Sequence, residues 1–164
     1  MKRTILIFLV FLAKFSIAQT VPDFDLIKLD KVSDYKAAEP FVLQTSTYLL
    51  STPFDSKNEN RSKSLQFIAR WMSGTAEQSF VLDDAASKII KGNDDLIGIY
   101  LAAMAKFSLE NKQLAKDPKV VKLNAINSLL DYSSNKINNL KPGKQLKKLL
   151  DAREKGQLEQ LLNN

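Results

Sequence analysis

Two short motifs place a lysine three residues after a serine, a spacing in which the lysine can activate the serine as a nucleophile. The first motif runs from Ser33 to Lys36, and the second runs from Ser133 to Lys136. Neither is accompanied by the Lys-Thr-Gly segment that completes sites of this kind, and the second falls in a polar run that predicts a loop or a frayed helix end. We therefore expect no serine catalysis from either motif.

The chain contains no histidine and no cysteine. This excludes serine-histidine and cysteine-histidine hydrolases, zinc sites of the usual kind, and haem ligation by histidine or thiolate. The densest carboxylate pairs are Asp83 with Asp84 and Asp94 with Asp95. Because neighbouring side chains point about 100° apart on a helix, these pairs suit helix capping better than the clamping of one ligand. We therefore predict a non-enzymatic protein with no catalytic residue, no cofactor and no metal site.

Basic residues concentrate near the end of the chain, where residues 136–155 contain seven Lys and Arg and two Asp and Glu. A helical projection places Lys144, Lys147, Lys148 and Lys155 on one face. This face is a candidate surface for an anionic partner, such as an acidic protein or lipid headgroups. The alternative is an ordinary solvated face, which is favoured by the acidic residues on the same face and by the lack of interleaved aromatic residues.

Three aromatic residues with polar tips, Trp71, Tyr100 and Tyr132, are candidates for lining a ligand pocket. Each also lies in an apolar stripe at helical spacing. Such stripes more often form the core of a protein than a binding site.

Hydrophobic periodicity predicts helices over nearly the whole chain after the first residues. The expected helices span residues 40–51, 56–74, 83–91, 94–109, 118–132 and 144–155, with a separate terminal turn after Gly156. Only Phe24 to Leu29 alternates in the way of a short strand, and extended chain suits it equally well.

Prolines and capping residues define several boundaries of these helices. Pro40 suits a first helical turn, and Pro53 closes the segment that it opens. Ser56 and Glu59 have capping-box spacing, which predicts a helix start at Ser56. Asp117, directly before a proline, predicts the start of another helix.

The segment from Leu96 to Leu109 is the strongest helical element, because Lys106 is its only charged residue. A helix this apolar is expected to be enclosed by its neighbours. Gly98, Ala102 and Ala105 gather on one side of it, which favours close approach of another helix.

The first eighteen residues have the pattern of a cleaved secretory signal. The apolar run from Ile5 to Ala13 follows a basic start, and at about 1.5 Å per residue it covers less than half of a bilayer core. Small residues at Ser16 and Ala18 predict cleavage after Ala18. Cleavage leaves 146 residues with a formal net charge of +3, no transmembrane anchor and no cysteine to carry a lipid.

These features predict an all-α protein, a bundle or stack of helical hairpins with five to six helices after the signal peptide. We expect residues 1–18 to be the signal peptide, residues 19–37 to be extended or irregular, and residues 38–164 to form a single helical domain. A secreted chain without cysteine also fits a bacterial envelope better than an environment that favours disulfides.

The stretches "FVLQTSTYLLSTPF", "SLQFIARWMSG" and "GNDDLIGIYLAAMAKF", behind a signal that ends in "SIAQ", resemble small exported helical proteins of Gram-negative bacteria with no assigned function. The resemblance implies an exported helical fold and brings no catalytic residue with it. Our leading hypothesis is a periplasmic or extracellular protein that binds another envelope protein, without specific nucleic-acid binding. The alternatives are a carrier of a small apolar or lipid ligand in a gap between helices, and an atypical hydrolase without His or Cys.

The signal pattern makes a direct prediction about processing. We expect N-terminal sequencing of the exported protein to begin at Gln19, either as glutamine or cyclised to pyroglutamate, because the peptidase cleaves after the small residue Ala18. Recovery of the exported protein with Met1 still attached would contradict the predicted location.

Overall fold

A computed structural model of the chain describes residues 21–80, 87 and 94–163. These residues form seven α-helices and three 3-10 turns, and no strand occurs among them. The helices are α1 (Val32–Ala37), α2 (Glu39–Ser51), α3 (Glu59–Gly74), α5 (Asp94–Glu110), α6 (Pro118–Ser134), α7 (Lys144–Glu154) and α8 (Leu158–Asn163), and the turns are η1 (Phe24–Leu26), η2 (Leu114–Lys116) and η3 (Lys136–Asn138). The predicted all-α fold class is confirmed.

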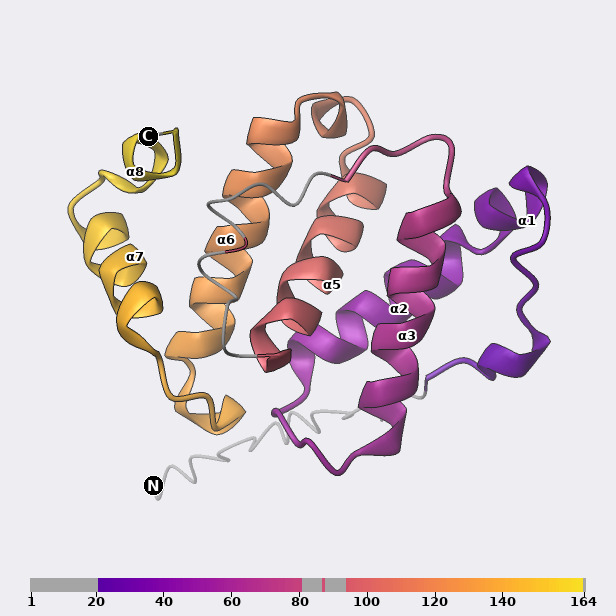
Figure 1. The fold of residues 1–164 in the computed structure, drawn as a ribbon, viewed down its shortest axis with the longest axis horizontal. Helices are drawn as coiled ribbons and strands as arrows, with labels where there is room; N and C mark the ends of the chain where they lie inside the picture. Colours follow the sequence, from indigo (N-terminus) through magenta and orange to yellow (C-terminus); the bar gives the residue numbers. More distant parts are fainter. Residues whose placement is uncertain (1–20, 81–86, 88–93, 164) are drawn as a thin grey trace, which may run out of the picture.

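The helices are arranged around α5, which lies between α6 on one side and α2 with α3 on the other (Figure 1). α7 packs on α6, and α8 follows against α7. α1 lies at the opposite end of the molecule, where it contacts α2 and α3. This arrangement is a helical bundle, one of the two architectures that the sequence predicts.

Two clusters of buried side chains form the core, and α5 contributes to both. Its larger residues, among them Ile99, Tyr100 and Met104, join buried residues of α6, α7 and α8. Its small residues Ala102 and Ala105 join the cluster formed with α2 and α3. The prediction that this helix is enclosed by its neighbours is therefore confirmed.

Gly98 marks a close approach between α5 and α3. A Cβ atom at this position would lie 3.2 Å from Cδ2 of Leu65, which is closer than most side-chain contacts. The side of α5 that carries its small residues therefore lies close to another helix, as predicted.

The ends of two helices follow the predicted signals. Pro40 lies in the first turn of α2, and the helix ends where Thr52 adopts extended backbone before Pro53. α6 begins at its predicted cap, where the carboxylate of Asp117 accepts the backbone N–H of Lys119 at 2.9 Å.

The predicted start of α3 at Ser56 is wrong, because the chain turns once more before the helix begins. The carboxylate of Asp55 accepts the backbone N–H of Lys57 at 2.9 Å and so stabilises this turn. Asn58 then caps α3 by accepting the backbone N–H of Arg61 at 3.3 Å. The end of the helix at Gly74 is as predicted.

The expectation that residues 19–37 are extended or irregular needs correction, because Val32–Ala37 forms α1. Asp34 stabilises its start by accepting the backbone N–H groups of Asp30 and Lys31, each at 3.1 Å. A helix of six residues is too short to show a periodicity, and contacts with the rest of the fold stabilise it. The alternative of a short strand is also wrong, since Phe24–Leu26 forms the turn η1.

Of the remaining expectations, the helix at residues 83–91 lies outside the described part of the chain except for residue 87, which is helical. The separate terminal turn after Gly156 is confirmed as α8. Gly156 has a left-handed backbone (φ 68°), and its N–H donates to Arg153 O at 3.0 Å while the N–H of Gln157 donates to Ala152 O at 2.8 Å. These two bonds close α7 with a Schellman motif, which turns the chain toward α8.

We expect Gly156→Ala to lower the free energy of unfolding by about 1 kcal/mol, because a Cβ is strained at this positive φ even though no atom lies near it. Gly156→Asn should cost less, since asparagine tolerates the left-handed region better. Chemical denaturation of the two variants and the parent chain measures the difference. A Gly156→Ala protein as stable as the parent would show that α7 does not need this cap.

Candidate functional site

Neither serine-lysine motif is arranged for catalysis in the structure. The ammonium of Lys36 lies 2.8 Å from a carboxylate oxygen of Glu77, and this contact raises the pKa of Lys36. A lysine held in its charged form cannot take a proton from Ser33. In the second motif, the hydroxyl of Ser133 is buried and donates to Leu130 O at 2.9 Å rather than to Lys136.

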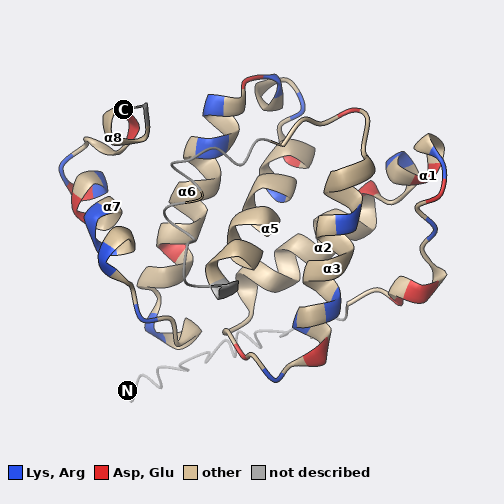
Figure 2. Cartoon of the chain, viewed as in Figure 1, with Lys and Arg blue, Asp and Glu red and all other residues tan. Residues whose placement is uncertain are grey.

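The four predicted lysines, Lys144, Lys147, Lys148 and Lys155, are all exposed on or directly after α7, and we call them the lysine surface. Figure 2 shows basic residues along this helix with acidic residues among them. No ion pair in the described part of the chain involves any of the four. The structure therefore leaves them accessible to solvent, and binding of an anionic partner stays a prediction.

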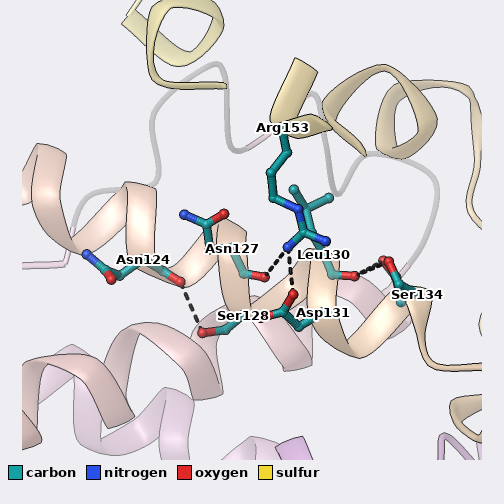
Figure 3. Close-up of polar contacts among 8 residues, drawn as sticks. Asn124, Asn127, Ser128, Leu130, Asp131, Ser134 and Arg153 are labelled. Carbon is teal, nitrogen blue, oxygen red and sulfur yellow. Dashed lines mark hydrogen bonds and ion pairs between the residues drawn. The ribbon is translucent and has the colours of Figure 1, made fainter. Parts of the chain in front are cut away.

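Arg153 differs from the four lysines, because its side chain on α7 binds residues of α6. Its guanidinium lies 2.6 Å from a carboxylate oxygen of Asp131 and donates to Asn127 O at 3.4 Å (Figure 3). Among the seven basic residues of this segment, Arg153 thus has a structural role, whereas the four lysines of the lysine surface are exposed to solvent.

The three aromatic candidates are buried, and they are divided between the two core clusters. Trp71 belongs to the cluster with α2 and α3, where its indole N–H donates to Tyr35 O at 2.9 Å. Tyr100 and Tyr132 belong to the cluster with α6, where the Tyr132 hydroxyl donates to Thr52 O at 2.7 Å. The structure does not bring the three residues together, and a ligand pocket lined by them stays a prediction.

An open groove of about 480 Å³ lies between residues 21–31, which we call the N-terminal segment, and α2. We call it the N-terminal groove. Its apolar lining includes Val21, Ile27 and Ala38, and two large side chains stand at its edges. Leu26 is 78% exposed and Phe41 is 42% exposed. Most large apolar residues of a folded chain are buried, so two exposed ones beside one groove indicate a contact surface.

Aromatic and apolar contacts hold the N-terminal segment against α3 and so fix one wall of the N-terminal groove. The ring of Phe24 packs on the ring of Phe67 with 4.9 Å between their centroids, and Leu29 is buried. Tyr35 packs so close to Gly74 that a Cβ there would lie 2.2 Å from the tyrosine ring. With these side chains turned inward, Leu26 is left at the surface.

The polar lining of the N-terminal groove includes two carboxylates, Asp23 and Asp34, and one ammonium group, Lys28. The backbone N–H groups of Asp30 and Lys31 lower the pKa of Asp34, so its carboxylate is charged at neutral pH. The groove therefore combines an apolar floor with a slightly acidic rim.

The carboxylate pairs that the sequence assigns to helix capping cannot be placed, because their side chains lie outside the described residues. Within the residues that are described, no group of three or more metal-binding side chains converges. None of the described helices has both the length and the apolar character that crossing a bilayer requires.

Comparisons with known proteins add no identification. No protein-family model matches the chain, and neither a curated protein nor a solved structure matches it.

Sequence reasoning missed the N-terminal groove, because it treated residues 19–37 as extended or irregular. The local pattern carried no signal for it. Phe41 lies in the first turn of α2, four residues before the buried Thr45 and therefore on the same side of the helix, yet it is 42% exposed. A helical projection places such a residue toward the core, so its exposure depends on the packing at the start of the helix rather than on the pattern.

We expect a variant in which all four residues of the lysine surface are replaced by Gln to fold normally, because exposed charges contribute little to stability. If the surface binds anions, the variant should lose binding to vesicles that contain anionic lipid, measured by co-sedimentation at low salt. The matched control replaces four exposed lysines outside α7, namely Lys57, Lys63, Lys116 and Lys119, and so removes the same charge. Equal binding by the two variants would assign the lysine surface to solubility.

Proposed function

We propose that this is an exported, non-catalytic helical protein that binds another envelope protein through the N-terminal groove. The observation that carries the proposal is the exposure of Leu26 and Phe41 beside an open apolar groove. Covering these two side chains would remove apolar surface from water at about 25 cal/mol per Å², which makes the groove a favourable place for a partner.

The groove is built for a partner segment that presents one large apolar side chain beside a basic residue. The apolar floor accepts the first, and the carboxylates of Asp23 and Asp34 attract the second. Lys28 is the one basic residue in the lining, so the charge of the rim still favours a basic partner.

A carrier of a small apolar or lipid ligand is the alternative function. Carriers enclose most of the surface of their ligand in a cavity. The N-terminal groove instead leaves its largest apolar side chains in contact with water, which suits a protein partner better. Hydrolysis without His or Cys stays the third hypothesis, with no described residue that favours it.

A photo-crosslinking amino acid at a groove position tests the proposal. We expect p-benzoylphenylalanine at Phe41, in the protein expressed in its native cells, to give a discrete protein adduct that mass spectrometry identifies. The same substitution at Ile137, which is 69% exposed but outside the groove, is the matched control and should give none. Leu26→Ser should remove the adduct from position 41 while leaving the melting temperature nearly unchanged, because Leu26 is exposed.

Other outcomes of this experiment separate the alternatives. An adduct with lipid, and none with protein, would favour the carrier. Equal adducts from positions 41 and 137, or an adduct from position 41 that Leu26→Ser does not change, would refute binding at the groove.

A further inference from the structure

A buried arginine joins three helices on the side of the bundle away from the N-terminal groove. Arg61 of α3 is 7% exposed, and one terminal nitrogen of its guanidinium, Nη1, donates to Leu49 O at 3.3 Å, Thr52 O at 3.1 Å and Thr52 Oγ1 at 2.7 Å. The other terminal nitrogen, Nη2, donates to the hydroxyl of Tyr132 in α6 at 3.3 Å. The side chain therefore caps the end of α2 and reaches α6.

These contacts use only part of the hydrogen-bonding capacity of Arg61. A guanidinium has five N–H groups, which lie in one plane. Both N–H groups of Nη1 are used at the end of α2, and one N–H of Nη2 is used by Tyr132. The Nε–H and the second Nη2–H have no acceptor among the described residues. These two groups belong to one edge of the guanidinium, the edge that binds a carboxylate with two parallel hydrogen bonds.

The charge of Arg61 is also without an acidic partner, because no ion pair in the described part of the chain involves it. The carbonyl groups at the end of α2 supply partial negative charge. The ring of Phe54 supplies more, with its centroid 5.6 Å from the guanidinium carbon. Neither carries a full negative charge, and a buried cation is stabilised most by an anion.

Arg61 lines a pocket of about 200 Å³ between the end of α2, the start of α3 and α5. Its walls are mixed: Phe54, Leu65 and Ile99 are apolar, whereas Asn58 and Ser62 are polar. A pocket of this size with one cationic group and an apolar wall suits a small ligand with a charged end and a short hydrocarbon part.

We propose that this pocket binds the carboxylate of a small aliphatic acid, with the Nε–H and Nη2–H groups of Arg61 as paired donors. A planar carboxylate matches the free edge of the guanidinium, and a short chain would lie against Phe54 and Ile99. Phosphate fits less well, because Asp55 also lines the pocket and repels a doubly charged anion more strongly. This site is separate from the N-terminal groove and does not depend on the function proposed for it.

Butyrate is the probe for this proposal, added to the mature chain and followed by NMR through the Nε–H resonance of Arg61. We expect a saturable shift with a Kd of about 1 mM, which is reasonable for a ligand this small. Butyramide has the same shape without the charge and should give no saturable shift. Phosphate at equal concentration should bind more weakly than butyrate.

Two variants test the pocket while keeping the structural bonds of Arg61, which Arg61→Lys would break. Ser62 is exposed at the pocket, and Ser62→Phe should fill the pocket mouth and weaken butyrate binding at least about tenfold. Asp55→Asn removes the competing charge, keeps the acceptor for Lys57 N–H, and should tighten binding about threefold. Asp25→Asn makes the same charge change on the N-terminal segment and should leave the Kd unchanged.

The proposal is wrong if butyrate gives no saturable shift of the Arg61 Nε–H, or if butyramide shifts it equally. It is also wrong if Ser62→Phe and Asp55→Asn both fold and leave the Kd of butyrate unchanged. Stronger binding of phosphate than of butyrate would replace the carboxylate assignment with a general anion site.

Discussion

The burial of one positive charge constrains how the ends of three helices meet in this bundle. The guanidinium of Arg61 is almost fully removed from water, so the carbonyl groups that replace its hydration must be held in place. Those carbonyls belong to the last turn of α2 and to Thr52, which also accepts the hydroxyl of Tyr132 from α6. The end of α2, the start of α3 and the end of α6 therefore meet at one polar junction, and the backbone N–H of Phe54 extends it by donating to Asn138 O at 3.3 Å.

α5 packs against both groups of helices that this junction connects. Its small side faces α2 and α3, where helix axes can come close, and its large side faces α6, where long side chains fill the space. One helix thus contributes to two clusters of buried residues and so connects the two halves of the bundle. A core divided in this way leaves the outer elements, α1 with the N-terminal segment and α7 with α8, to present the exposed surfaces on which the functional hypotheses rest (Figure 1).

The sequence predicted the parts of the fold that depend on long periodic patterns. The helices predicted over residues 94–109, 118–132 and 144–155 could be read from the sequence, because the apolar residues of each repeat over several turns. α1 was not, since its six residues depend on Asp34 and on contacts with α3. The structural role of Arg61 was missed for a related reason. An arginine near the start of a helix is expected to be exposed to solvent, and the carbonyl groups that Arg61 contacts lie nine and twelve positions earlier in the chain. The N-terminal groove likewise joins segments that no local pattern connects.

The hydrogen bond from Trp71 to Tyr35 O has a spectroscopic consequence. Trp71 is the chain's single tryptophan, it is completely buried, and its indole N–H reaches the backbone of α1. The intrinsic fluorescence of this protein therefore comes from one indole that reports on the docking of the segment that forms one wall of the N-terminal groove. Detachment of α1 would expose the indole to water and shift its emission to longer wavelength, even with α5 to α8 still folded. The emission wavelength of Trp71 therefore reports whether α1 is docked on α3.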